Sequence, residues 1–326
     1  MAELRYNPLT KDWTMIASHR QNRPQMPKDW CPFCPGSGNV PDDFTVFKYD
    51  NDFPALSQTP PVPDDVATEL YKTKEAYGKC EVILYSPKHT ITLPELSVSH
   101  IRELVDLWTE RFSELRKDEK IKYIFIFENR GDVVGVTMPH PHGQIYGYSY
   151  IPKKLELELA SCKEYYDENE KCLICDMIEN EVSAKSRIII ENDDFVTFLP
   201  FFTDYPYGVF IAAKEHVQNL TQFSDRQKDN LARILKETAG TLDSLFGYAF
   251  PYMMCMHQDP VNSGDFSDYF HFHIEFYPPM RSADKQKFNA SSETGAWAAC
   301  NPTSPEEKAE ELRMAHKKFL ETMKGE

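Results

Sequence analysis

The six residues Pro139-His140-Pro141-His142-Gly143-Gln144 set two histidines among prolines, directly before a run with β-strand character. Each proline fixes φ at about −65° and lacks an amide donor, so both imidazoles project from a backbone with few conformations to lose on folding. Histidine is largely neutral, and therefore nucleophilic, at physiological pH. One histidine alone would be a core or surface residue. The whole string indicates a rigidly held nucleophile at His142, with the His140 carbonyl as a candidate acceptor for its second ring nitrogen.

Working outward from this string, residues of the metal-ligating types occur twice in the same order. The first half carries Cys31, Cys34, His89 and His140-x-His142, and the second half carries Cys172, Cys175, His216 and His271-x-His273. The spacings are similar, and the residues before His89 and His216 are alike. We infer two copies of one ancestral unit, 1–160 and 161–326.

Each copy shows the same coarse pattern of secondary structure. Apolar residues at spacings of three and four predict helices over 97–116 and 224–246, and a C-terminal helix over 312–324. Segments rich in β-branched and aromatic residues predict the strands, which are 81–85, 121–127, 187–191, 196–199 and 269–277. The strands outnumber the helices. The expected fold class is α+β, with two tandem repeats and an antiparallel sheet whose helices pack on one face.

The two Cys-x-x-Cys pairs each offer half of a metal site, although a lone pair of this kind is also typical of redox motifs. Cys31, Cys34, His89 and His140 make a complete Cys₂His₂ set, which predicts a closed, structural zinc site. The repeat predicts the same for Cys172, Cys175, His216 and His271. The four remaining cysteines are expected to be small buried apolar residues; they are Cys80, Cys162, Cys255 and Cys300.

Charge and hydropathy exclude some classes of partner. The chain of 326 residues has 36 Lys and Arg against 51 Asp and Glu, a formal net charge of −15. This balance argues against non-specific binding to nucleic acid and against an anionic membrane surface. No apolar run reaches the roughly 18 residues of a membrane span, and the first residues lack the pattern of a signal peptide. A cytoplasmic location is the expectation.

The proline-histidine string and its surroundings resemble the galactose-1-phosphate uridylyltransferase family, a branch of the histidine-triad superfamily in which Gln replaces the third histidine. The match runs over nearly the whole chain in order. Its segments include Arg20-Gln21-Asn22-Arg23-Pro24, Asn51-Asp52-Phe53, Phe127-Glu128-Asn129-Arg130-Gly131, Gly135-Val136-Thr137 and Lys287-Phe288.

The resemblance implies a reaction and a set of site residues. His142 would attack UDP-glucose, Gln144 would assist it, and the uridylyl group would pass to galactose 1-phosphate or another hexose 1-phosphate. Substrate contacts are implied for Arg20, Arg23, Asn51, Asp52, Asn129, Gly135, Val136, Thr137, Gln144, Lys287, Phe288 and Glu293. A homodimer is implied, with Lys287-Phe288 reaching the partner's site. The chain departs from the family at Thr137, where Ser is usual, and at Ser292, where Tyr is usual.

The resemblance also opens a second interpretation of the second metal site. Many family members bind iron or zinc with a Glu and three histidines, which match Glu158, His257, His271 and His273. Those members typically lack the second cysteine pair. Because two thiolates two residues apart are difficult to leave unused, we favour Cys172, Cys175, His216 and His271.

Two other functions stay open. A related nucleotidyl phosphorylase or hydrolase would form the same intermediate from an ADP- or UDP-sugar but pass the nucleotide to phosphate or water. A zinc-stabilised nucleotide-binding module without catalysis would require the intact histidine string to be idle. The acceptor that discharges a labelled enzyme distinguishes these hypotheses.

Overall fold

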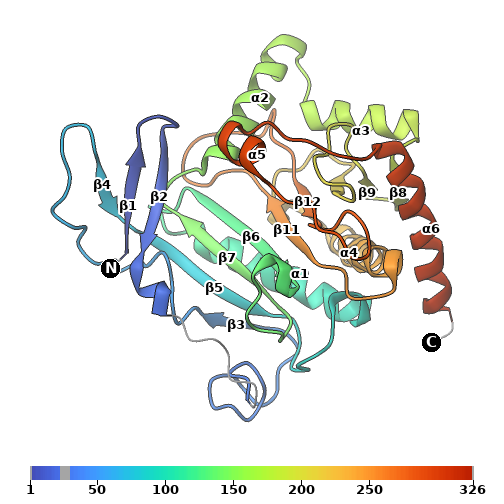
Figure 1. Cartoon of the computed structure of the whole chain (residues 1–326), viewed down its shortest axis with the longest axis horizontal. Coiled ribbons are helices and arrows are strands. Elements are labelled where there is room, and N and C mark those ends of the chain that lie inside the picture. Colours follow the sequence, from blue (N-terminus) through green and yellow to red (C-terminus); the bar gives the residue numbers. More distant parts are fainter. Residues whose placement is uncertain (1, 23–29, 325–326) are drawn as a thin grey trace.

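The computed structural model describes residues 2–22 and 30–324 and shows one large antiparallel sheet with helices and a smaller second sheet (Figure 1). The nine-stranded sheet has the order β3-β5-β7-β6-β11-β12-β10-β9-β8. Its strands are β3 (Phe47–Asp50), β5 (Gly78–Leu84), β6 (Tyr123–Arg130), β7 (His142–Tyr148), β8 (Ile188–Glu191), β9 (Phe195–Phe198), β10 (Phe210–Ala213), β11 (Tyr252–His257) and β12 (His273–Tyr277). All neighbouring strands in it pair antiparallel, which confirms the expected α+β class.

The strand order repeats about the centre of this sheet. In the first half, β7 lies between β5 and β6; in the second half, β12 lies between β10 and β11. The two halves join where β6 pairs with β11. His142 begins β7 and His273 begins β12, so the two copies place corresponding histidines at corresponding strand ends.

Two long helices cover one face of the sheet. Helix α1 (Val98–Leu115) begins at Ser97, whose side chain accepts from the His100 amide, and α4 (Asp225–Phe246) begins at a capping box of Ser224 and Gln227. Both helices are amphipathic, and their apolar faces form one continuous core with the sheet; examples are Trp108, Leu235, Ile126 and Ile274. The C-terminal helix α6 (Pro305–Met323) packs on α4 through Leu312 and Ala309.

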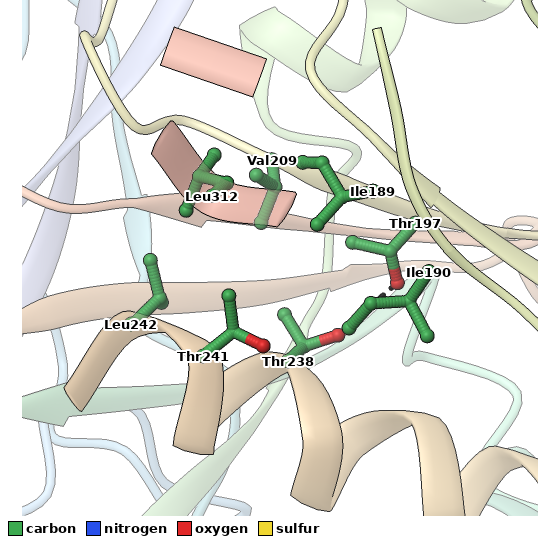
Figure 2. Close-up of a pocket in the computed structure, with 8 residues that line it drawn as sticks. All are labelled: Ile189, Ile190, Thr197, Val209, Thr238, Thr241, Leu242 and Leu312. Carbon is green, nitrogen blue, oxygen red and sulfur yellow. Dashed lines mark hydrogen bonds between the residues drawn. The ribbon is translucent and has the colours of Figure 1, made fainter. Parts of the chain in front are cut away.

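Figure 2 shows part of the core where α4 and α6 meet the second half of the sheet. A small gap there admits no water molecule and is lined by Ile189, Ile190, Thr197, Val209, Thr238, Thr241, Leu242 and Leu312. The hydroxyls of Thr197 and Thr238 bond to each other at 3.1 Å, so these buried polar atoms are satisfied. This part of the molecule is scaffold.

The opposite face of the sheet is covered less evenly. A three-stranded sheet of β1 (Ala2–Asn7), β2 (Asp12–Ala17) and β4 (Thr73–Glu75) packs near β5 and β7 through Leu4. Helix α2 (Lys153–Asn169) contributes Leu155 to the same cluster, and α3 (Leu173–Ala184) follows it. The short elements are η1 (Ser18–Asn22), η2 (Leu93–Glu95), η3 (Asp132–Val134), η4 (Leu220–Gln222) and α5 (Ser291–Ala296).

The structure differs from the sequence-based expectation in several places. The C-terminal helix expected over 312–324 begins earlier, at Pro305. Helices α2 and α3 were not predicted, because α2 buries only Leu155, Leu159 and Cys162 and so has a weak apolar face. The strand expected over 269–277 begins only at His273, because the amides of residues 269 and 270 bond back to Phe266 in a turn. Cys300 is exposed, so its expected burial was wrong. Among the described residues, no helix is long and apolar enough to cross a membrane.

Candidate functional site

His142 is held by the backbone of the residue two positions before it. Its Nδ1 lies 2.7 Å from the carbonyl oxygen of His140, and its half-buried ring packs edge-on against Phe33 with centroids 5.9 Å apart. Because a carbonyl oxygen only accepts, Nδ1 must carry the proton. The Nε2 atom therefore carries the lone pair, which is the state that a nucleophilic imidazole needs.

The first cysteine-histidine group surrounds the ring of His140. Cys31, Cys34, His89 and His140 place their ligand atoms within 4.8 Å of one another. The Cys34 sulfur lies 3.4 Å from Nδ1 of His89 and 3.6 Å from Nδ1 of His140. Sulfur and nitrogen ligands of a tetrahedral zinc ion are roughly 3.5 Å apart, given its bond lengths.

The second ring nitrogen of His140 faces away from the cysteines. Nε2 donates to the Ser86 carbonyl at 2.7 Å, which fixes the tautomer so that Nδ1 can bind a metal. Burial lowers the pKa of His140 to about 4, so the ring is neutral at physiological pH. The arrangement fits a closed structural metal site in which this chain supplies all four ligands.

The second half repeats this group. Cys172, Cys175, His216 and His271 also lie with their ligand atoms within 4.8 Å. Nδ1 of His271 is 3.3 Å from the Cys175 sulfur, and its Nε2 donates to the Ala213 carbonyl at 2.7 Å. Hydrogen bonds from Cys175 and the two histidines lower the pKa of Cys172, which favours a thiolate ligand.

A third group lies at the start of β12. Glu158, His257, His273 and Glu275 place their ligand atoms within 4.8 Å of one another. His257 Nδ1 lies 2.7 Å from one oxygen of Glu158, and His257 Nε2 lies 3.2 Å from Glu275. The other Glu158 oxygen is buried without a hydrogen-bond partner, and the donor set of two carboxylates and two imidazoles fits a zinc or iron ion.

These three groups change the choice between the two metal sets expected for the second half. His271 lies with the cysteines, so the set of Glu158, His257, His271 and His273 is not assembled as expected. In the third group, Glu275 takes the position that was expected for His271 as the fourth ligand. The two interpretations are therefore not exclusive, because the chain has ligand atoms for both kinds of site.

The segment before the histidines presents backbone and hydroxyl donors. Asn129 is half-buried near the end of β6, and the chain then turns through η3. Gly135 ends η3 with φ of 81°, a left-handed conformation that favours glycine. Val136 is half-buried and Thr137 is exposed. Gln144 lies on β7 two residues after His142 and therefore on the same face.

The expected nucleoside residues follow β3. The Asn51 side chain accepts from the Phe53 amide at 2.9 Å, which is the turn that such an Asn often makes. Asp52 is exposed, and its carboxylate accepts from the Tyr49 hydroxyl at 3.0 Å. Arg20 is half-buried at the end region of η1; burial raises the pKa of the Cys80 thiol, and the charge of Arg20 opposes that rise. Arg23 lies outside the described residues.

The last expected substrate residues lie against the second half. The Lys287 ammonium lies 4.8 Å from the ring centroid of Tyr205 and donates to Asn289 at 2.9 Å. Phe288 is 73% exposed, and Glu293 accepts from the Ala290 amide in the first turn of α5. The contacts of Lys287 and Glu293 are with residues of the second half.

Sequence reasoning missed Glu275, a member of the third group, and Lys154, which contacts it. Lys154 donates to Glu275 at 2.6 Å and also to the Tyr277 hydroxyl. The internal repeat could have indicated Glu275. Glu275 follows His273 by two residues, as Gln144 follows His142. No local pattern distinguishes Lys154, at the first turn of an unexpected helix.

Comparison with known families gives two matches that together span the chain. Residues 1–152 match the family described as galactose-1-phosphate uridyl transferase, N-terminal domain. Residues 158–320 match the family described as galactose-1-phosphate uridyl transferase, C-terminal domain.

Individual proteins agree with this. Galactose-1-phosphate uridylyltransferase of Thermotoga maritima is 41% identical over 314 residues, covering 96% of this chain and 98% of that protein. A solved structure of uridylyltransferase superposes with a TM-score of 0.90 at 31% identity, covering 98% of this chain and 99% of that one. An ADP-glucose phosphorylase from Arabidopsis thaliana with bound ADP-glucose gives a TM-score of 0.74 at 25% identity, covering 96% and 98%.

Proposed function

Because the chain belongs to the galactose-1-phosphate uridylyltransferase family, we propose that it moves a uridylyl group from UDP-glucose to galactose 1-phosphate through a covalent intermediate on His142. The observation that carries this proposal is the 2.7 Å contact between Nδ1 of His142 and the His140 carbonyl. It leaves Nε2 as the nucleophilic nitrogen of an oriented, neutral ring.

In the first half-reaction, Nε2 of His142 attacks the α-phosphorus of UDP-glucose. A nitrogen–phosphorus bond forms, the bond from that phosphorus to the bridging oxygen breaks, and glucose 1-phosphate leaves with the electron pair. A sugar phosphate is a good leaving group, so no strong general acid is required. The proton stays on Nδ1, hydrogen-bonded to the His140 carbonyl, which stabilises the positive charge that develops on the ring.

In the second half-reaction, a phosphate oxygen of galactose 1-phosphate attacks the same phosphorus. The nitrogen–phosphorus bond breaks, UDP-galactose forms, and His142 returns to its starting tautomer. Both steps need an in-line approach and donors to the equatorial phosphate oxygens. Gln144, Thr137 and the backbone at Val136 are the donors we assign, because they lie on or directly before the strand that begins with His142.

The cysteine groups have a structural role in this proposal. Cys31, Cys34, His89 and His140 would hold zinc, and so would Cys172, Cys175, His216 and His271. We assign zinc or iron to Glu158, His257, His273 and Glu275. Bound metal would fix the backbone around His140 and His271.

We also propose a homodimer, as the family resemblance implies. In the segment carrying Lys287, Phe288 and Glu293, the Lys287 ammonium contacts Tyr205 of the second half, and Phe288 and Trp297 expose 73% and 64% of their surface. Large exposed aromatic side chains are enriched in interfaces. Light scattering after gel filtration measures the mass in solution, and a monomer at working concentrations would contradict this assignment.

The test of the reaction uses UDP-glucose labelled in its uridylyl group. The wild-type protein should retain about one label per chain, as an acid-labile phosphoramidate on His142 that peptide mapping locates. His142→Ala should retain none. His316→Ala is the matched control, because His316 lies on α6 beside Glu237, outside the site, and this variant should label normally.

Discharge of the labelled protein identifies the acceptor. Galactose 1-phosphate should release the label as UDP-galactose, whereas release by inorganic phosphate alone would favour a nucleotidyl phosphorylase. The likeness to the ADP-glucose phosphorylase makes ADP-glucose the donor to compare. Retention of label by His142→Ala, or tight binding of UDP-glucose without any label, would refute the proposal.

A further inference from the structure

Gly143 lies on the opposite face of β7 from His142 and Gln144. Side chains alternate along a strand, so the residue between two that face the substrate must face the helices. Its pairing agrees with this, because Gly143 lies opposite Ile83 of β5, whose side chain is in the core with α1. A glycine at this position leaves no side chain on the helix-facing side of β7, next to the nucleophile.

Tyr85 occupies the space that a side chain at position 143 would fill. A Cβ built on Gly143 would lie 2.4 Å from the Tyr85 hydroxyl oxygen and 3.1 Å from the carbon that bears it. The Tyr85 amide also donates to the carbonyl of Pro141 at 3.0 Å. Tyr85 therefore contacts the chain on both sides of His142, at the residue before it and the residue after it.

Tyr85 is itself held firmly. Its ring is 1% exposed and packs edge-on against Trp108 of α1, with centroids 5.9 Å apart. Close to its hydroxyl lies Glu128 of β6, a fully buried carboxyl that accepts from the Tyr252 hydroxyl at 3.2 Å. Burial raises the pKa of Glu128 to about 7, while the hydroxyls of Tyr252 and Tyr85 act to lower it.

Two polar atoms in this cluster lack a well-formed bond. The Tyr85 hydroxyl and the second oxygen of Glu128 have no partner at normal hydrogen-bond geometry, although each affects the other's pKa. Leaving both unsatisfied would be costly in the interior, so a small movement that brings them together is favourable. The movement would shift the hydroxyl that lies against Gly143.

We propose that Tyr85, packed against Trp108 and bonded through its amide to Pro141, is a positioning residue that sets the backbone of His142 and Gly143 and so orients the imidazole toward phosphorus. This inference rests on the proposed function, since it concerns the same uridylyl transfer. Tyr85 does not touch substrate. It acts through Gly143, and its hydroxyl makes glycine the residue required at that position.

The test is a double-mutant cycle. Gly143→Ala places a methyl group against the Tyr85 hydroxyl and should slow labelling of His142 in a single turnover by about 100-fold, the scale of a 1 Å misplacement. Tyr85→Phe keeps the ring and the amide bond to Pro141, and should slow labelling by roughly fivefold with the Kd for UDP-glucose unchanged. Because Tyr85→Phe removes the colliding oxygen, the double variant should label about tenfold faster than Gly143→Ala alone.

Gly147→Ala is the matched control on the same strand and face. A Cβ there meets the side chain of Ile121 at 2.9 Å and not Tyr85, so Tyr85→Phe should not rescue it. Thermal unfolding of every variant distinguishes loss of the fold from misorientation of the His142 imidazole in a folded protein.

Three results would overturn the inference. They are a double variant as slow as Gly143→Ala, equal rescue of Gly147→Ala, and an effect of Tyr85→Phe on substrate affinity alone. If Gly143→Ala does not fold, Tyr85→Phe decides, and a labelling rate within about twofold of wild type refutes it. Failure of the wild-type protein to label would instead refute the proposed function, so the two failures are distinguishable.

Discussion

The carbonyl of His140 lies 2.7 Å from Nδ1 of His142, while the ring of the same His140 lies 3.6 Å from the sulfur of Cys34. One residue thus joins the candidate nucleophile to the first cysteine group. Its side chain belongs to the metal-binding arrangement and its backbone orients the imidazole that reacts. Loss of the metal should therefore move the acceptor of His142 without touching His142 itself.

Cys34→Ala tests this link. Cys34 contacts both His89 and His140, so its loss should remove one equivalent of bound metal. Without the metal, the His140 backbone is less restrained, and labelling of His142 by UDP-glucose should slow by about 100-fold. Elemental analysis and single-turnover labelling measure the two effects. A variant that loses the metal but labels at the wild-type rate would show that the link is not functional.

Cys175→Ala is the corresponding change in the second half. Cys175 contacts His216 and His271 at 3.3 Å each, so this variant should also lose one metal equivalent and should unfold at a lower temperature. Labelling of His142 should stay within about threefold of wild type, because the two groups share no described residue. Calorimetry and the same labelling assay provide the readouts. Equal losses of labelling in both cysteine variants would mean that the two halves act as one unit.

The two cysteine groups could be predicted because the order of their ligands is a property of the sequence. His89 and His216 follow similar strands, and His140 and His271 each precede the strand that lies centrally in its half of the sheet. The repeat therefore predicted which residues meet. It also predicted helices that the structure has as α1 and α4, since both have strong apolar faces with clear N-caps.

The third group could not be predicted in full, because it depends on long-range pairing. His257 lies opposite His273 in the register between β11 and β12, and Glu158 reaches them from α2. Neither the register nor the docking of a weakly amphipathic helix is visible in a local pattern. The contact between Tyr85, directly after β5, and Gly143 on β7 is of the same kind, since the two residues are 58 positions apart in sequence (143 − 85 = 58).

Glu158→Gln tests whether the third group binds a metal. Glu158 has one buried oxygen without a hydrogen-bond partner, and a metal ion would satisfy it. The wild-type protein should bind about three metal ions per chain, and this variant about two, with both cysteine groups still loaded. Elemental analysis with thiol titration measures this. The exposed Glu164→Gln on the same helix is the control and should bind as wild type does. Two ions in the wild-type protein would contradict metal binding at this group.

The pH dependence of stability should depend on Glu128. Burial raises its pKa from 4.5 to about 7, and the facing groups are Tyr85, Tyr252, Arg130 and Asp243. Below about pH 4.5 the carboxyl is protonated in both the folded and unfolded states, so its full contribution to the free energy of unfolding is present there. As pH rises through the folded pKa of about 7, the unfolded state has already lost its proton and the folded state must ionise a buried group, so that contribution is lost.

Glu128→Gln removes this titration and keeps the shape of the side chain. The difference in free energy of unfolding between wild type and this variant should therefore fall between about pH 4.5 and pH 7 and be constant at higher pH. Urea unfolding across that range measures the difference, and subtracting the variant cancels the other titrating groups. A difference that stays constant with pH would mean that Glu128 keeps an ordinary pKa when folded. In that case the carboxyl would be ionised at neutral pH and could only accept from Tyr85.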